Sequence, residues 1–239
     1  MKSFYVNLLF SLLACIPAVA QEQSLDDILD KYYKAMGIDH LKKVNSMVMT
    51  GLMTQNDVMP VKVYRLRPDK YLMEFDIADL TAYQGYDGTT AWMTTPWTGN
   101  PKPQVMPPDR VGAMKITAEF EGILFNWKAK GHLVELAGKD TVNQVIMNKL
   151  KITKNDGGVE YLFIDPGDNL IKKRLYNRTV RGREILMENY FSDYRPVDGI
   201  MFGFKQDTRI GGQPYNSLQY ETIELNKEID PGLFSMPKP

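Results

Sequence analysis

Side chains that commonly perform catalysis are few in this sequence, and their spacing fits none of the common catalytic or metal-binding motifs. The two histidines, His40 and His132, lie far apart, so neither forms an H-x-x-x-H or H-E-x-x-H metal pair. The chain contains no G-x-S-x-G nucleophile turn and no G-x-x-x-x-G-K-[ST] phosphate loop. The run 165–169 has the composition of a calcium loop, but its proline and its short span favour a tight turn.

The remaining nucleophiles and acids also single out no site. The only cysteine, Cys15, lies in an N-terminal apolar segment, so the rest of the chain offers neither a thiol nucleophile nor a disulfide. The 29 acidic residues leave room for a dispersed acid pair of the kind that hydrolyses glycosides, although no spacing marks one. We therefore predict no catalytic residue, metal or cofactor, and rank a hydrolase last among the possible functions.

The first 20 residues are typical of an export signal. Lys2 provides a positive start, the run 4–14 is almost entirely apolar, and Ala18-Val19-Ala20 has the small-x-small form of a signal-peptidase site. The apolar run is too short to span a bilayer stably. Cleavage after Ala20 would release a soluble periplasmic protein, and we expect residues 21–239 to form a single domain.

A lipid-anchored form is the alternative. Leu12-Leu13-Ala14-Cys15 resembles a bacterial lipobox, in which the cysteine becomes the lipidated first residue. Residues 16–20 would then form an apolar leader, where lipoproteins usually begin with polar linker residues. The sequence favours cleavage at Ala20 over anchoring through Cys15.

The charge balance argues against a nucleic-acid partner. The chain has 29 basic and 29 acidic residues, and 28 against 29 once the first 20 residues, with their single lysine, are removed. One segment departs from this balance, with six basic residues and no acidic one: Lys172, Lys173, Arg174, Arg178, Arg181 and Arg183. This basic segment is either a docking patch for anionic headgroups or a partner, or a solvated hairpin that blocks edge pairing.

Two segments have helical spacing. Ser24 can cap a helix whose apolar residues recur every three or four positions up to Met36, and Gly37 is its natural stop. A second helical stretch is predicted over 109–127, with one apolar face; Gly112 and Gly122 weaken it, so it is either one helix or two short ones. That face would contain Phe120, Ile123, Leu124 and Trp127.

The other segments alternate with a period of two and predict about twelve strands. Turn residues separate them by short links, which require antiparallel neighbours. The segment 95–108 contains five prolines, so it can be neither a central strand nor a helix interior. After it, strands are expected over 133–139, 144–154, 159–164, 171–180, 183–194, 201–210 and 214–225. Such a meander must curl to bury its apolar face.

Three short motifs resemble the LolA/LolB-like superfamily of outer-membrane lipoprotein-sorting proteins. R-P-[ND]-x-[FY] matches 67–71, D-G-x-x-x-W-x-x-x-P matches 87–96, and a closing I-D-P-x-L-F segment begins at Ile229. The resemblance covers essentially the whole chain after the export signal. It implies a mainly β, α+β fold: an incomplete antiparallel β-barrel of about 11–12 strands, with an N-terminal helix and a helical lid over its concave apolar face.

The resemblance also suggests site residues. Arg67 matches the arginine that bonds the lid in the family's carriers, although it could equally be a turn arginine paired with a nearby carboxylate. Trp92 matches the aromatic residue after the D-G turn, as either core or cavity wall. Alternation points the early strand residues inward, where flexible methionine suits a cavity for acyl chains or simply fills the core. The lipid-cavity candidates are Met47, Met49, Met53, Tyr71, Met73, Phe75 and Trp92, with Phe120, Leu124 and Trp127 on the lid.

Two non-catalytic functions follow from the resemblance. The first is a periplasmic carrier, monomeric and part of outer membrane biogenesis, which binds the acyl chains of a lipoprotein or another lipid and contacts a membrane or a membrane-bound partner transiently. The second is an envelope sensor or interaction module that uses the same fold to bind a protein. An acceptor anchored through Cys15 is a variant of the first function.

Overall fold

The computed structural model describes residues 23–180 and 182–238. The predicted export signal, with Cys15 and Ala20, lies outside this range, as does Arg181 of the basic segment. Within the described residues, no helix has the length and apolar character needed to cross a membrane.

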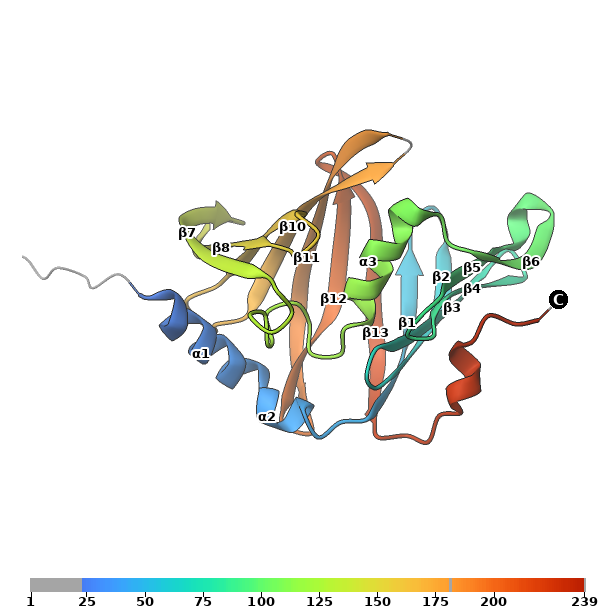
Figure 1. Cartoon of the computed structure of the whole chain (residues 1–239), viewed down its shortest axis with the longest axis horizontal. Coiled ribbons are helices and arrows are strands. Elements are labelled where there is room, and N and C mark those ends of the chain that lie inside the picture. The colour runs from blue at the N-terminus through green and yellow to red at the C-terminus, as the bar shows by residue number, and fades with distance from the viewer. Residues whose placement is uncertain (1–22, 181, 239) are drawn as a thin grey trace, which may run out of the picture.

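A single antiparallel sheet forms most of the molecule (Figure 1). The strand order is β6-β5-β4-β3-β2-β1-β13-β12-β11-β10-β9-β8-β7, so β1 and β13 join the two halves of the chain at the centre, and β6 and β7 are free edges. The sheet is therefore open, and the predicted incomplete antiparallel barrel is confirmed. Its strands are β1 (Ser46–Thr54), β2 (Val58–Leu66), β3 (Lys70–Ile77), β4 (Leu80–Tyr86), β5 (Ala91–Thr95), β6 (Asn100–Val105), β7 (Leu133–Val142), β8 (Val145–Thr153), β9 (Val159–Ile164), β10 (Ile171–Val180), β11 (Arg183–Val197), β12 (Ile200–Ile210) and β13 (Gln213–Leu225).

The described residues contain 13 strands, more than the 11–12 expected. The proline-rich segment contributes one of them, β6, which follows the 3-10 turn η1 (Pro96–Thr98). Proline lacks an N–H donor, so it is tolerated where one side of a strand needs no partner. The position of β6 at the sheet edge satisfies that condition.

The N-terminal helix α1 (Leu25–Met36) begins and ends as its sequence predicts. The Ser24 hydroxyl accepts a hydrogen bond from the Asp27 N–H at 3.1 Å, which satisfies a free donor of the first turn. Gly37 ends the helix with φ of 69° and leads into α2 (Ile38–Leu41). A Cβ at Gly37 would lie 2.1 Å from the carbonyl oxygen of Gly199, so this close approach to the sheet requires glycine.

The second predicted helix is shorter than expected. Helix α3 spans Pro108–Ala118, and an irregular segment follows up to Gly131; we call residues 108–131 the lid. Gly122 and Asn126 have φ of 77° and 53°, outside the right-handed helical region, so the backbone cannot continue as a helix there. The prediction of a helical stretch over 109–127, as one helix or two short ones, is therefore wrong beyond Ala118. The lid is helical only in its first half.

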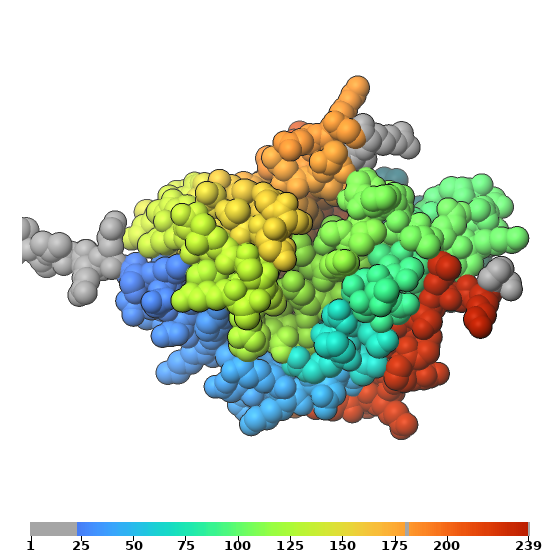
Figure 2. All heavy atoms as spheres, viewed as in Figure 1, coloured from blue at the N-terminus to red at the C-terminus, as the bar shows by residue number. Residues whose placement is uncertain are grey.

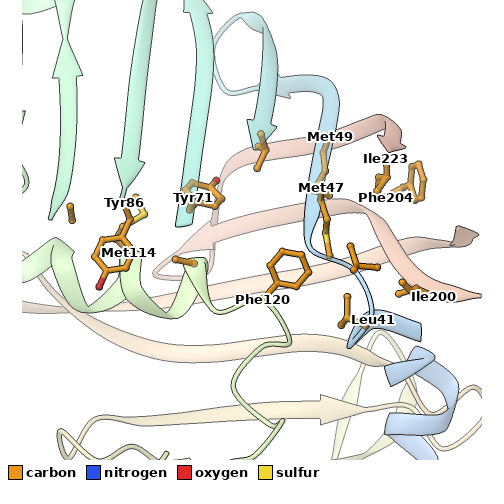
Figure 3. Packing of buried hydrophobic residues seen from close by; sticks show 14 of the residues in the cluster. Leu41, Met47, Met49, Tyr71, Tyr86, Met114, Phe120, Ile200, Phe204 and Ile223 are labelled. Atoms are coloured by element: carbon orange, nitrogen blue, oxygen red, sulfur yellow. The ribbon is translucent and has the colours of Figure 1, made fainter. Parts of the chain in front are cut away.

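Buried apolar residues lie on both faces of the curved sheet. On the concave face, the lid residues Phe120 and Met114 pack in one cluster with Met47, Tyr71 and Tyr86 of the sheet (Figure 3). A second concave cluster packs α1 against β7 to β9. On the convex face, the C-terminal 3-10 turn η2 (Pro231–Phe234) covers a third cluster.

Candidate functional site

The larger concave cavity lies between α3 and the β1–β5 half of the sheet. Its volume is about 610 Å³, within the range of small-molecule sites. Methionine side chains from five parts of the chain line its wall, and methionine adapts to irregular apolar shapes. They are Met53, Met59, Met93, Met106 and Met114, accompanied by the aromatic rings of Tyr71, Phe75 and Trp97.

This cavity also has polar lining residues. Arg110 on α3 and Arg178 on β10 line it, together with the side chains of Tyr215, Asn216 and Gln55. Among the described residues, no aspartate or glutamate belongs to the cavity wall. The wall therefore combines apolar side chains with two positively charged ones.

A smaller cavity of about 290 Å³ lies on the other side of the lid. It is lined by Tyr32 and Met36 of α1, by Ile123 and Leu124 of the lid, and by residues of β9 to β13. Ile116 of α3 faces this cavity, whereas Met114 faces the larger one. The lid therefore separates the two cavities, which lie on the same concave face of the sheet. Figure 2 shows the surface hollowed beside α3, next to the β10–β11 hairpin.

Arg67 connects the lid to the first half of the sheet. Its guanidinium donates to the Glu121 carboxylate at 2.5 Å, and to the backbone carbonyls of Val44 at 2.5 Å and Leu41 at 2.8 Å. The guanidinium carbon also lies 4.3 Å from the centre of the Phe120 ring. Both charged side chains are mostly buried, at 24% and 18% exposure. Arg67 is therefore paired with a nearby carboxylate, as one interpretation expects. That carboxylate, Glu121, belongs to the lid, so Arg67 also bonds the lid, as the other interpretation expects.

A second arginine, not identified from the sequence, supports the lid beside Arg67. Arg65 donates to the backbone carbonyls of Glu119 at 2.5 Å and Thr117 at 3.1 Å, at the C-terminal end of α3. A cation is favourable there because the helix dipole is negative at that end. Burial lowers the pKa of the Arg65 guanidinium. The signal that could have revealed Arg65 is its charge at an inward position of β2, two residues after the buried Val63.

The other helix also holds the lid. The Tyr33 hydroxyl of α1 donates to the Leu124 carbonyl at 2.7 Å. Within the lid, the Lys130 ammonium donates to the Glu119 carboxylate and to the Gly122 carbonyl, each at 2.8 Å. The lid is therefore attached by a few polar contacts around an apolar underside.

The predicted cavity residues divide into four groups. Met53, Tyr71 and Phe75 line the larger cavity, and Leu124 lines the smaller one. Met47, Met49 and Phe120 are buried in the concave core between them. Met73 is partly buried against two clusters of this face, and Trp127 packs against the cluster under α1.

Trp92 is a core residue on the opposite face and lines neither cavity. Its indole N–H donates to the Phe234 carbonyl at 2.8 Å, and its ring packs with Leu72 and Phe234. Gly85 provides the space for it, since a Cβ there would lie 2.4 Å from the indole ring. Two of the three family-like motifs therefore meet in space. The third joins them, because the Lys70 ammonium donates to the Asp87 carbonyl at 2.9 Å.

The basic segment does not form one patch. Lys173 and Arg174 pair with Glu188 and Glu160 at 2.6 and 2.7 Å, and Lys172 pairs with Asp168. Arg183 is exposed at the start of β11, whereas Arg178 lines the larger cavity. Three of the six charges are thus compensated by neighbouring carboxylates, which argues against a continuous docking surface.

The histidines and acids are not gathered into a metal site. Across residues 23–180 and 182–238, no group of three or more histidine, cysteine, aspartate or glutamate side chains is arranged to hold a metal ion. His132 accepts a hydrogen bond from the Asn155 N–H at 3.3 Å and so supports a turn.

Comparisons with known proteins connect this architecture to a group of solved structures. No family model and no curated protein matches the chain. A domain from Vibrio parahaemolyticus, provisionally assigned as an outer membrane lipoprotein-sorting protein, has a TM-score of 0.61 and 11% identity, covering 87% of this chain and 94% of that domain. A LolA superfamily protein from Nitrosomonas europaea has a TM-score of 0.60 and 11% identity, over 89% and 98% of the two chains.

A DUF1329 family protein from Desulfovibrio piger is similar to the same extent, with a TM-score of 0.59 and 12% identity, over 87% of this chain and 97% of that one. At this level of identity the likeness shows the fold, and it extends over nearly the full length of each structure. The resemblance indicated by the sequence motifs is therefore confirmed for the fold. The chain has the fold shared by LolA superfamily and lipoprotein-sorting structures.

Proposed function

We propose that this protein is a non-catalytic periplasmic carrier that binds the acyl chains of a lipid or lipoprotein on its concave face. The observation that carries the proposal is the methionine-lined cavity of about 610 Å³ beneath a lid held by Arg65 and Arg67. An acyl chain gains about 0.8 kcal/mol for each methylene removed from water, so an adaptable apolar cavity is the main requirement for such a carrier. The names of two similar structures, a lipoprotein-sorting domain and a LolA superfamily protein, support this direction.

Cargo entry in this proposal requires the lid to move. Because Met114 faces one cavity and Ile116 the other, displacement of α3 would expose a continuous apolar surface. The polar contacts of Arg67 with Glu121 and of Tyr33 with Leu124 hold the lid closed when it carries no cargo. A few such contacts suit a lid that must open, since each contributes only about 1–3 kcal/mol.

The periplasmic location rests on the predicted export signal. Cleavage at Ala20 would give a free shuttle, which we favour, whereas lipidation of Cys15 would give a tethered acceptor. The sensor alternative has less support, because three charges of the basic segment are engaged by carboxylates of their own sheet. A docking role for Arg183 and its neighbours is therefore not part of the proposal.

A pair of adjacent substitutions on α3 tests the proposal. Ala113 lines the larger cavity, whereas Gly112 is exposed and has open space beside it. Ala113→Trp should fill part of the cavity and weaken binding of a fluorescent fatty acid by roughly 10-fold or more. Gly112→Trp places the same ring on the solvent side and should bind like the wild-type protein. Equal binding by wild type and both variants, or no binding by the wild type, would contradict the proposal.

A further inference from the structure

Two arginines, Arg110 and Arg178, line the larger cavity, and their charges are not balanced by a carboxylate as those of Arg67 and Arg174 are. Arg174, at the smaller cavity, pairs with Glu160, and Arg67 pairs with Glu121. Among the described residues, neither Arg110 nor Arg178 takes part in an ion pair. These two positive charges face a cavity whose described wall contains no acid.

Of the two arginines, Arg178 is partly buried and Arg110 is exposed to solvent, and both have few hydrogen bonds within the described residues. The Nε atom of Arg178 is buried and has no hydrogen-bond partner within residues 23–180 and 182–238. Arg110 donates only to the Met93 sulfur, at 3.6 Å, which is a weak acceptor. A buried guanidinium donor without an acceptor is costly, so a ligand that supplies oxygen acceptors would be stabilised there.

The two arginines come from different parts of the fold that both line the larger cavity. Arg110 is in the first turn of α3, and Arg178 is near the end of β10, which contacts α3. In Figure 1 the N-terminal end of α3 lies next to the β10–β11 hairpin. Tyr215 and Asn216 of β13 add polar side chains at the same cavity. Guanidinium groups bind carboxylate and phosphate through paired N–H donors.

We propose that the cavity selects an anionic lipid, with its carboxylate or phosphate head bound between Arg110 and Arg178 and its acyl chain in the methionine-lined interior. The inference rests on the proposed carrier function and narrows its cargo. A neutral lipid would leave the buried Nε of Arg178 without an acceptor and should bind more weakly. The smaller cavity, where Arg174 is already paired with Glu160, would accommodate apolar chain only.

The test compares ligands that differ in head charge alone. The probes are cis-parinaric acid and its methyl ester, followed by phosphatidylglycerol and diacylglycerol with identical chains as competitors. The wild-type protein should bind the acid, or phosphatidylglycerol, at least about 10-fold more tightly than its neutral counterpart, as expected for charge-assisted hydrogen bonds. A preference within the phospholipid pair assigns a phosphate head, and a preference confined to the fatty-acid pair assigns a carboxylate head.

A matched pair of double variants connects the preference to the two arginines. Arg110→Gln with Arg178→Gln should reduce binding of the charged ligand to the level of the neutral one and leave the neutral ligand unaffected. Lys115→Gln with Arg183→Gln removes two exposed charges from the same helix and the same hairpin, and should retain the preference. Equal binding of charged and neutral ligands by the wild type overturns the inference and leaves the carrier proposal standing. Failure to bind either ligand overturns both.

Discussion

Neutralising Glu121 should loosen the lid and leave the sheet intact. Glu121→Gln removes the negative charge 2.5 Å from the Arg67 guanidinium, in a pair whose side chains are 24% and 18% exposed. Such a mostly buried, hydrogen-bonded pair contributes more than a surface ion pair, about 1–2 kcal/mol. Arg67 keeps its bonds to Val44 and Leu41, so the loss falls on the lid contact. The open fraction of the lid should then rise about 5- to 30-fold.

Hydrogen exchange resolved by segment measures this effect. Amides of the lid, residues 108–131, should exchange about 5- to 30-fold faster in Glu121→Gln, and those of β1 and β13 should not change. Asp140→Asn is the control, because it removes an ion pair with Lys149 at the exposed sheet edge. That change should leave exchange in the lid unaffected. Unaltered lid exchange in Glu121→Gln, or an equal acceleration throughout the sheet, would refute the role assigned to Arg67.

Two further predictions concern stability. Trp92→Phe should lower the free energy of unfolding by about 1–3 kcal/mol, because the Phe234 carbonyl loses its buried donor. Ligand affinity should be unchanged. Weaker ligand binding with unchanged thermal stability would contradict the placement of Trp92. Burial raises the pKa of Glu188, but the hydrogen bond and charge of Lys173 outweigh it and hold that pKa below its ordinary 4.5. The ion pair of Glu188 with Lys173 therefore stabilises the fold above about pH 4.5, and this stabilisation is lost as the pH falls through the lowered pKa. The melting temperature of Glu188→Gln should consequently depend less on pH, between about 6 and 3, than that of the wild type.

The strands were predictable because a half-buried strand carries its burial pattern in alternate residues. The bounds 159–164 and 171–180 agree with β9 and β10, and the proline-rich segment was correctly excluded from the sheet centre. The same reasoning failed for 109–127, where apolar residues spaced by three or four continue past the helix end. Their burial comes from irregular backbone at Gly122 and Asn126, which periodicity cannot describe.

The candidate site was predictable only in part. Met53 lies on β1, and Tyr71 and Phe75 lie on β3 beyond the intervening β2, and alternation alone placed them on one face. Arg110 and Arg178 meet at the cavity through tertiary contacts between α3 and β10, and no local pattern relates them. Apart from Arg67, which bonds the lid, and Tyr71, which lines the larger cavity, the contacts of the family-like motifs hold turns and the C-terminal segment on the convex face. They therefore indicated the fold and said little about the ligand.

The most direct test of the carrier function is native mass spectrometry of the protein purified from cells that export it. The account predicts a mature chain beginning at Gln21 together with a second species heavier by the mass of a lipid, which gentle activation releases. A lipid-free mass alone, in protein that also fails to take up added fatty acid or phosphatidylglycerol, would contradict the central claim.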